Sequence, residues 1–441
     1  MSKNKGITLI ALIITIIILL ILVGVSVNLL IKGDLFGSAQ KAVNGTNAKV
    51  EEQQTAVDEL MGELGRVEEQ QRQDNLPGTR VTENTKYVSN GKSAWIPKGF
   101  TVSGIKSEQS IDNGLVIYDI PEGITPDWTN PDSVKTKYNQ FVWIPVEVKS
   151  TDTENSIVSF YRSKWTANAS TGGERTTGLS TDYTEPDSTN DTVDKTGIAD
   201  QITELTKSIY KYGGFYIGRY EAGTATPRTS GLSQTAEFVV QQDKYPYIYI
   251  TWGKSMSDVS EGAVYLCNNL YSSTNTNYGA TSMLCTGAVW DSMLDFVKDS
   301  NHSVTDSTTW GNYYDSETYK VYRGSLAGTE VTTNKSILLT TGATERNSSK
   351  NIYDVAGNCV EWTTESCFSS SRVARGRWLQ LPCFCRSSKL PQRRQSDRQQ
   401  LHRRRVSPSA LCKTVSLQAI HEFNINKMCI SRNSKIHILF V

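Results

Sequence analysis

Histidine and cysteine are scarce in the first 365 residues of this 441-residue chain. That part holds one of the four histidines, His302, and three of the eight cysteines, Cys267, Cys285 and Cys359. A metal site built on several histidines, such as an iron site, is therefore excluded from it. Three cysteines are also too few for a disulfide framework, which leaves Cys267 and Cys285 either as one disulfide or as two buried thiols.

Charged residues are absent from Gly6 to Ile31, a run of 26 residues. At about 1.5 Å per residue, a helix of this length crosses the roughly 30 Å hydrocarbon core of a bilayer. The run is too long for the apolar core of a cleaved signal peptide, and it is apolar on every face, unlike a helix of a soluble protein. We therefore predict a transmembrane helix over residues 7–31.

The charges around this helix predict its orientation. Lys3 and Lys5 precede it, whereas Lys32 and Asp34 follow it and nearly cancel. The positive-inside rule then places the N-terminus in the cytoplasm. We expect a single-pass protein of the cell membrane with its C-terminal domain outside the cell.

The junction at residues 5–10 (KGITLI) resembles the cleavage site of type IV prepilins. The resemblance implies a leader over residues 1–6, a cut by a prepilin peptidase between Gly6 and Ile7, and methylation of the new N-terminus. Pilins usually carry Glu five residues after the cut, where this chain has Ala11. That difference argues against a major fibre subunit and leaves two alternatives, an anchor that stays in the membrane and a minor pseudopilin.

Residues 32–76 have the pattern of a mostly polar stalk helix, which Pro77-Gly78 ends. A sparse apolar stripe runs along it, formed by Ala39, Ala42, Val43, Val50, Val57, Leu60, Met61, Leu64 and Val67. We interpret the helix as a solvated stalk, with self-association along the stripe as the alternative. Residues 77–139 are then a linker and an accessory β region.

Acidic and basic residues are divided unevenly along the chain. Residues 1–365 contain 31 Lys+Arg and 43 Asp+Glu, a net charge of −12, whereas residues 366–441 contain 15 against 2, a net charge of +13. Such a basic tail could bind nucleic acid or an anionic surface, but a domain outside the cell has no nucleic-acid partner. Because all 20 Tyr also precede residue 366, we interpret residues 377–441 as an aberrant tail, out of frame or disordered.

Between residues 80 and 376, short β-type runs alternate with loops rich in Ser, Thr, Asn and Asp. Strands are predicted at Leu115–Ile120, Phe141–Val148, Ile157–Tyr161, Phe215–Tyr220 and Tyr247–Trp252. Helices are predicted at Lys254–Leu270 and Thr286–Val297, where apolar residues recur at helical spacing. This mixture predicts an α+β domain with irregular connections.

Five blocks in this region resemble, in order, the formylglycine-generating enzyme (sulfatase-modifying factor) family. They are residues 141–146 (FVWIPV), 213–221 (GGFYIGRYE), 250–252 (ITW), 286–291 (TGAVWD) and 351–363 (NIYDVAGNCVEWT). The last block is the most specific, because it follows the family pattern G-L-Y-D-M-x-G-N-V-W-E-W-T. The resemblance implies an elaborated C-type lectin-like fold over residues 140–376.

The last block also suggests a metal site. Asp354 and Glu361 flank the turn at Gly357-Asn358, and carboxylates with exposed carbonyls are ligands that Ca²⁺ prefers. The resemblance implies calcium bound by the Asp354 side chain, the Gly357 and Cys359 carbonyls and the Glu361 carboxylate. The alternative is that the two carboxylates cap the turn and pair with an arginine.

The family's enzymes carry a copper-binding cysteine pair after an R-V-x-R-G-G-S strand. Residues 372–376 (RVARG) match the start of that strand, but the match stops at Arg377. Cys383 and Cys385 follow at about the right distance, but they lie in the segment that we interpret as an aberrant tail, so we do not expect copper.

We therefore predict a surface protein that binds an extracellular ligand or protein without catalysis. The alternatives are a copper- and oxygen-dependent oxidoreductase of the formylglycine-generating type and a minor pseudopilin subunit.

Overall fold

The computed structural model describes residues 37–176, 183–186, 197–229, 236–254, 258–314, 316–333, 337–367, 371–376, 385–387, 434–436 and 438–440. The chain divides into two compact units, Met1–Arg72 and Gln73–Val441. The predicted leader and transmembrane helix lie outside the described residues. Among the residues that are described, no helix has the length and apolar character needed to cross a membrane.

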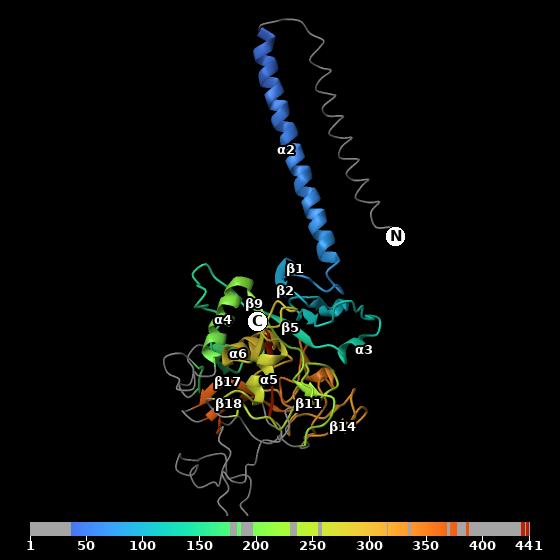
Figure 1. The fold of residues 1–441 in the computed structure, drawn as a ribbon, viewed down its shortest axis with the longest axis vertical. Helices are drawn as coiled ribbons and strands as arrows, with labels where there is room; N and C mark the ends of the chain where they lie inside the picture. Colours follow the sequence, from blue (N-terminus) through green and yellow to red (C-terminus); the bar gives the residue numbers. More distant parts are fainter. Residues whose placement is uncertain are drawn as a thin grey trace, which may run out of the picture. The chain divides into compact units, whose positions relative to one another are not determined.

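The first unit is described from residue 37 onward, where one helix, α2 (Gly37–Asp74), runs for 38 residues (Figure 1). It occupies most of the range 32–76 expected for the stalk. Ion pairs one turn apart lie along it, between Arg66 and Glu63 (3.9 Å) and between Arg72 and Glu69 (2.7 Å). Four apolar side chains on it are more than half exposed, namely Val50, Leu60, Met61 and Val67.

The second unit is built around a six-stranded sheet in the order β12-β21-β9-β5-β4-β3. Each neighbouring pair is antiparallel. The strands are β3 (Thr101–Val102), β4 (Val116–Tyr118), β5 (Gln140–Pro145), β9 (Gly214–Gly218), β12 (Ser282–Leu284) and β21 (Ile438–Phe440). Every residue of β9 and the first five of β5 are buried, so the sheet is covered on both faces and forms the centre of the core.

A second sheet contains β17 (Val360–Cys367), β18 (Ser371–Arg375), β19 (Cys385–Ser387), β20 (Ser434–Ile436) and β8 (Tyr183–Thr184). β17 and β18 are antiparallel, with an irregular register between Trp362 and Ser366, and β20 runs parallel to β17. Five two-stranded sheets complete the unit: β1–β2 (Thr85–Ser89, Lys92–Ile96), β6–β7 (Lys164–Thr166, Glu174–Thr176), β10–β11 (Gly223–Thr224, Tyr245–Pro246), β13–β14 (Tyr319–Lys320, Glu330–Val331) and β15–β16 (Ser348–Ser349, Ile352–Tyr353).

Three of these strands, β19, β20 and β21, come from the range 377–441. Their nine residues pair with β17 and β18, and with β9 and β12. This placement differs from the interpretation of that range as a tail unrelated to the upstream fold. The physical reason lies in residues 436–441 (IHILFV), an apolar, β-branched run of the kind that pairs in buried sheets.

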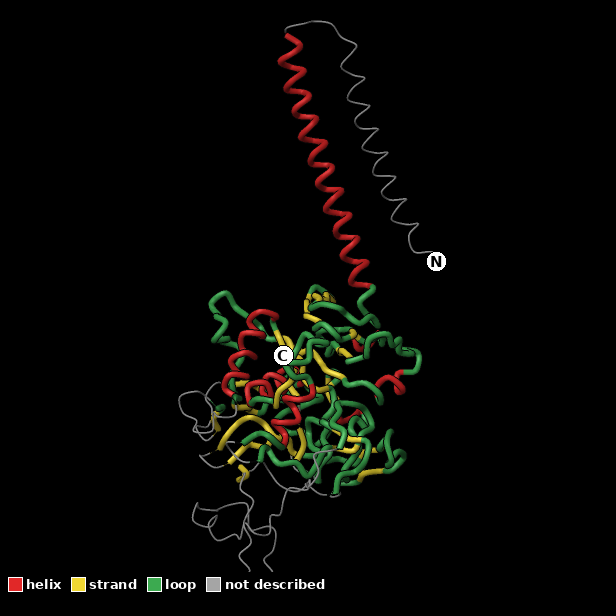
Figure 2. The backbone as a smooth tube through the Cα atoms, in the orientation of Figure 1, coloured by secondary structure: helices red, strands yellow, loops and turns green. Residues whose placement is uncertain are grey.

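In the described part of this unit, four α-helices flank the sheets: α3 (Pro131–Lys135), α4 (Ile198–Tyr212), α5 (Gly262–Leu270) and α6 (Gly287–Val297). α6 begins as predicted, because the Thr286 side chain accepts a hydrogen bond from the Val289 N–H (3.2 Å). α5 covers only the second half of its predicted range, since Gly262 adopts a φ of 90° at its start. Loops and turns make up much of the unit (Figure 2), and the mixture of helices with small sheets gives an α+β domain.

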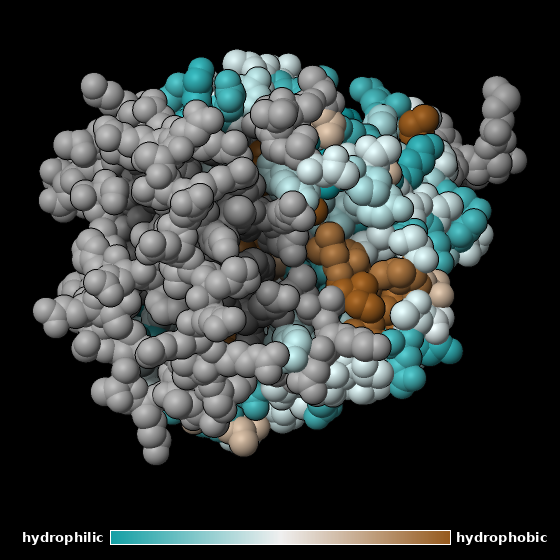
Figure 3. Space-filling view, turned by 90° about the horizontal axis from the view of Figure 1, so that it is seen from below, coloured by the Kyte–Doolittle hydropathy of each residue, from teal (hydrophilic) through white to brown (hydrophobic). Residues whose placement is uncertain are grey.

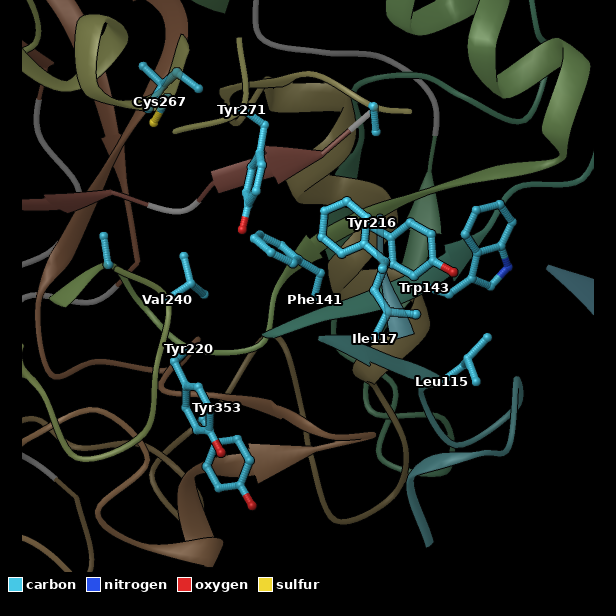
Figure 4. Packing of buried hydrophobic residues seen from close by; sticks show 14 of the residues in the cluster. Leu115, Ile117, Phe141, Trp143, Tyr216, Tyr220, Val240, Cys267, Tyr271 and Tyr353 are labelled. Atoms are coloured by element: carbon cyan, nitrogen blue, oxygen red, sulfur yellow. The ribbon is translucent and has the colours of Figure 1, made fainter. Parts of the chain in front are cut away.

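Aromatic side chains fill the core of this domain. Figure 4 shows Phe141, Trp143, Tyr216 and Tyr271 among the packed residues of β5, β9 and the loop after α5. One ion pair is buried with them, from Arg219 to Glu108 (2.8 Å), and Lys135 lies 3.1 Å from the same carboxylate. Burial would raise the pKa of Glu108, but the charges of Arg219 and Lys135 lower it to about 2.

The surface has a different character. On the face drawn in Figure 3, most of the described residues are hydrophilic, and the largest visible hydrophobic patch lies right of the centre of the view.

Candidate functional site

The predicted processing residues, Gly6 and Ile7, lie outside the described residues. Of the cysteines after residue 376, Cys383 also lies outside them, and the backbone of Cys385 pairs with Val373 in the second sheet. The other predicted site residues all lie in the α+β domain.

The predicted calcium loop connects β16 to β17 and is tightly packed. Asp354 and Asn358 both have a φ of 60°, and Gly357 has a φ of 98°. A side chain at Gly357 would collide with the backbone of Asn312. That backbone holds the loop on both sides, since the Asn312 N–H donates to the Ala356 carbonyl (2.8 Å) and the Asn358 N–H donates to the Asn312 carbonyl (2.7 Å).

Asn358 is the centre of this loop, a role that sequence reasoning missed. Its side-chain oxygen accepts hydrogen bonds from the Leu339 N–H (2.9 Å) and the Asn312 amide (3.0 Å). Its amide nitrogen donates to the Glu221 carboxylate (3.1 Å). Because all of these groups are buried, the bonds fix the loop in one conformation.

Two of the four oxygens proposed as calcium ligands already accept backbone hydrogen bonds. The Asp354 carboxylate accepts from the Gly342 N–H (2.8 Å), and the Gly357 carbonyl accepts from the Cys359 N–H (2.8 Å). Asp354 and Glu361 are each 1 % exposed. Within the described ranges, no three His, Cys, Asp or Glu side chains are grouped so as to hold a metal ion. The protein's own N–H groups thus bond to two of the four proposed ligand groups, and calcium binding stays a prediction.

Cys267 and Cys285 are free, buried thiols, and Cys359 is buried as well. Of the two alternatives left open for Cys267 and Cys285, one disulfide or two buried thiols, the structure has the two buried thiols. Burial raises the pKa of the Cys267 and Cys285 thiols well above the ordinary value. Both thiols are therefore protonated at neutral pH, and a protonated, buried thiol is a poor nucleophile.

The structure also brings together two arginines and three carboxylates, which we call the arginine–carboxylate cluster: Arg162, Glu185, Asp291, Glu365 and Arg375. The Arg162 guanidinium bonds to Glu365 (2.6 Å) and to Asp291. The Arg375 guanidinium donates two hydrogen bonds to Glu365 (2.5 and 2.7 Å). Glu185 accepts from the Thr364 hydroxyl (2.6 Å) and from the Gly287 N–H at the start of α6.

Burial shifts the pKa values of two carboxyl groups in this cluster. Burial raises the pKa of Glu185. Burial and the negative charge of Glu185 raise the pKa of Glu365 to about 7, although Arg162 opposes the rise. A carboxyl with such a pKa can exchange a proton near neutral pH. However, Glu365 is fully buried and its oxygens are already bonded to two arginines, so the cluster joins segments of the fold.

Comparison of this chain with protein families, with curated proteins and with solved structures gives no match.

Proposed function

We propose that this chain is a membrane-anchored bacterial surface protein whose lectin-like, formylglycine-generating-enzyme-like domain binds an extracellular ligand or partner without catalysis. The observation that carries the proposal is the arginine–carboxylate cluster. It joins β17 and β18 to α6 and to the segments around residues 162 and 185. The cluster ties these elements together by buried bonds, and binding proteins hold their recognition loops on such rigid scaffolds.

The buried groups support binding over catalysis. Cys267, Cys285 and Cys359 are buried, and the pKa values of the first two are raised. His302, a candidate general base, bonds to Asp299 (2.9 Å) and packs edge-on against Trp310. Each of these groups already has a local structural partner or is closed to solvent.

The full-length chain in lipid nanodiscs tests the proposal. We expect saturable binding to intact cells of at least one kind, measured by flow cytometry, in buffer with and without EDTA. Arg375→Met should weaken binding, because it removes two bonds to Glu365, whereas Lys320→Met, at an exposed position on β13, should leave binding unchanged.

Stoichiometric Cu(I) binding with oxygen consumption would instead support the oxidoreductase alternative. A methylated Ile7 at the mature N-terminus, found together with assembly into fibres, would support the pseudopilin alternative.

A further inference from the structure

The β1–β2 hairpin has two outer edges, and the protein covers one of them. In the hairpin, Lys86 lies opposite Trp95 and Val88 lies opposite Ser93. The Gln73 side chain covers the edge of β1, because its amide donates to the Lys86 carbonyl (3.0 Å) and its oxygen accepts from the Val88 N–H (2.9 Å). These two residues therefore point their backbone groups away from β2, so they belong to the non-hydrogen-bonded pairs of the ladder. By the same pairing, the backbone groups of Ser93 and Trp95 point away from β1.

The outer edge of β2 has no such cover. Within the described ranges, the outward N–H and C=O groups of Ser93 and Trp95 make no hydrogen bond. Ser93 is exposed and Trp95 is partly exposed. A row of unpaired backbone groups is a template for another strand, and a hairpin of only two strands gains stability from a third. We call Ser93 and Trp95 the open edge of β2.

A groove of about 620 Å³ adjoins the open edge, since Trp95 is one of its lining residues. The Trp95 ring lies 5.5 Å from the ring of Tyr212, at the end of α4, with an angle of 60° between the rings. Asn84 holds this wall, because its amide donates to the Tyr212 hydroxyl (3.4 Å). A side chain at Gly279 would collide with Asn84, so the glycine keeps the groove free on that side. A volume of this size has room for the side chains of a short peptide.

The charge around the groove is mainly positive. Lys98 and Lys211 line it, and among its described lining residues Glu83 carries the only negative charge. Lys86 adds a third ammonium, because it lies opposite Trp95 and therefore on the same face of the hairpin. The Lys98 ammonium donates to the Thr276 carbonyl (3.0 Å), a neutral partner that leaves its charge in place. The groove thus favours an occupant with negative charge.

This charge also decides between two sources of an added strand. A second copy of β2 would bring Lys92 and the lysines of its own groove to the same edge, and like charges across an interface disfavour association. A strand from another protein that carries carboxylates would be attracted instead. The open edge lies in the accessory region before residue 140, and so outside the range that resembles the formylglycine-generating enzyme family.

We propose that the open edge of β2 and its groove bind an extended acidic peptide segment of a partner protein. The backbone of the segment pairs with Ser93 and Trp95 as a third strand. Its apolar side chains pack on Trp95 and Tyr212, and its carboxylates lie near Lys98 and Lys211. Strand addition of this kind takes affinity from main-chain hydrogen bonds and specificity from side-chain pockets. The inference adds a surface to the proposed function and does not depend on it.

The test uses the full-length chain in nanodiscs and a labelled eight-residue peptide, followed by fluorescence anisotropy. The peptide has threonine at every second position and, between these, valine and aspartate in turn. We expect saturable binding that weakens about tenfold when lysine replaces aspartate. Two further versions are N-methylated, one at the odd and one at the even positions. Only one of them should lose affinity, by about tenfold, because only alternate N–H groups of a strand face its neighbour.

Ser93→Pro and Ser93→Ala are a matched pair of variants. The hairpin ladder does not use the Ser93 N–H, and proline is tolerated where a strand N–H faces outward, so both variants should fold. Ser93→Pro should weaken binding about tenfold, because it removes an edge donor, whereas Ser93→Ala should bind like the parent. Where Ser93→Pro fails to fold, the N-methylated peptides still test the edge on the parent chain.

Lys211→Glu tests the charge of the groove. It should weaken binding of the aspartate peptide and strengthen binding of the lysine peptide, an exchange that simple loss of structure cannot produce. Lys164→Glu, at an exposed position on β6, is the matched control and should leave both affinities unchanged.

Several results would overturn the peptide site. Equal affinity of the two N-methylated peptides and the unmodified one would show that no strand is added, and equal affinity of the aspartate and lysine peptides would remove the role of charge. If no peptide binds while intact cells still do, the peptide proposal fails and the proposed function stands. If the aspartate peptide binds as expected and cells do not, the peptide site stands and the proposed function fails.

Discussion

At the scale of single residues, buried charges and their partners organise this domain. Arg372 is fully buried, donates to the Thr364 carbonyl (3.1 Å) and lies 3.9 Å over the Trp252 ring. Arg219 is paired with Glu108, and Arg162 with Glu365. Removing one partner of such a buried pair generally costs about 3–5 kcal/mol, because the other charge is left behind in a medium that solvates it poorly.

The pair of glutamates in the arginine–carboxylate cluster predicts how stability changes with pH. The ordinary pKa of Glu365 is 4.5, and in the folded chain it is about 7. Between these values the folded state holds a proton that the unfolded state has released, so stability is greatest at the acidic end and falls as pH rises through 7. The loss is on the order of 3 kcal/mol if the whole shift is realised, since one pKa unit corresponds to about 1.4 kcal/mol. We expect the melting temperature, followed by circular dichroism, to fall between pH 5 and pH 8.

Glu185→Gln should flatten this profile. It removes the negative charge that helps to raise the pKa of Glu365, while its amide oxygen can still accept from the Gly287 N–H. Glu204→Gln, on the surface of α4, is the matched control and should leave the profile unchanged. A melting temperature of the parent that stays constant or rises over this range would contradict the prediction.

The residues of the site were only partly predictable from sequence. The motif at residues 351–363 identified Asp354 and Glu361 as neighbours of a turn, because Gly357 and Asn358 mark the turn locally. Their partners come from distant positions: Asn358 bonds to Glu221, and Arg162 bonds to Glu365 across 203 residues. No local pattern encodes such pairs, because the partners are far apart in the sequence.

At the scale of elements, the apolar runs in the sequence predicted the central strands correctly. Two other predicted strands are loops or turns in the structure. The runs at 115–120, 141–148 and 215–220 correspond to β4, β5 and β9. The strand predicted at Tyr247–Trp252 is wrong: the Ile248 and Ile250 carbonyls accept from the Arg228 and Trp362 side chains, so no neighbouring strand is needed. The run at Ile157–Tyr161 forms a turn instead, closed by the Phe160 N–H on the Ile157 carbonyl.

The helix α4 shows a signal that sequence reasoning overlooked. Apolar residues recur at Ile198, Ile202, Leu205, Ile209 and Tyr212, a spacing of three and four that is typical of an amphipathic helix. Three of them are fully buried. Gly213 ends the helix with a φ of 77°, as glycine commonly does.

The stripe on α2 predicts contact with a second copy of the chain. Val50, Val57 and Leu64 are seven residues apart, Leu60 and Val67 are also seven apart, and a strict seven-residue apolar repeat favours two supercoiled helices. Val50, Leu60 and Val67 are more than half exposed within one chain. We expect Leu64→Cys to form disulfide-linked dimers in membranes under mild oxidation, seen by non-reducing electrophoresis.

Thr55→Cys, on the opposite side of the heptad, is the control and should give no more dimer than the parent chain. Equal dimer yields at both positions would indicate random collision and would leave α2 as a solvated stalk.

At the scale of the whole molecule, the point where the net charge changes sign is not the point where the paired strands end. The net charge changes from −12 to +13 near residue 366, yet β20 pairs with β17 and β21 pairs with β9 and β12. Composition is an average over many residues, whereas a strand needs only a few apolar ones in register. The basic composition of residues 377–433 therefore says little about residues 434–441.

The position of β21 predicts that residues 434–441 stabilise the fold. It lies between β12 and β9 in the six-stranded sheet, with Leu439 opposite Ile217 and Met283. A chain that ends at Asn433 leaves the facing N–H and C=O groups of β9 without partners in a buried sheet, and each such group costs about 1–3 kcal/mol. The open edge can also pair with other chains. For this shortened chain, we expect a lower midpoint in chemical denaturation and more aggregate in size-exclusion chromatography than for the full-length chain.

A full-length variant with residues 434–441 in scrambled order keeps length and charge and should behave like the shortened chain. Equal midpoints for all three would mean that these residues add nothing to the fold, in agreement with the interpretation of residues 377–441 as an aberrant tail.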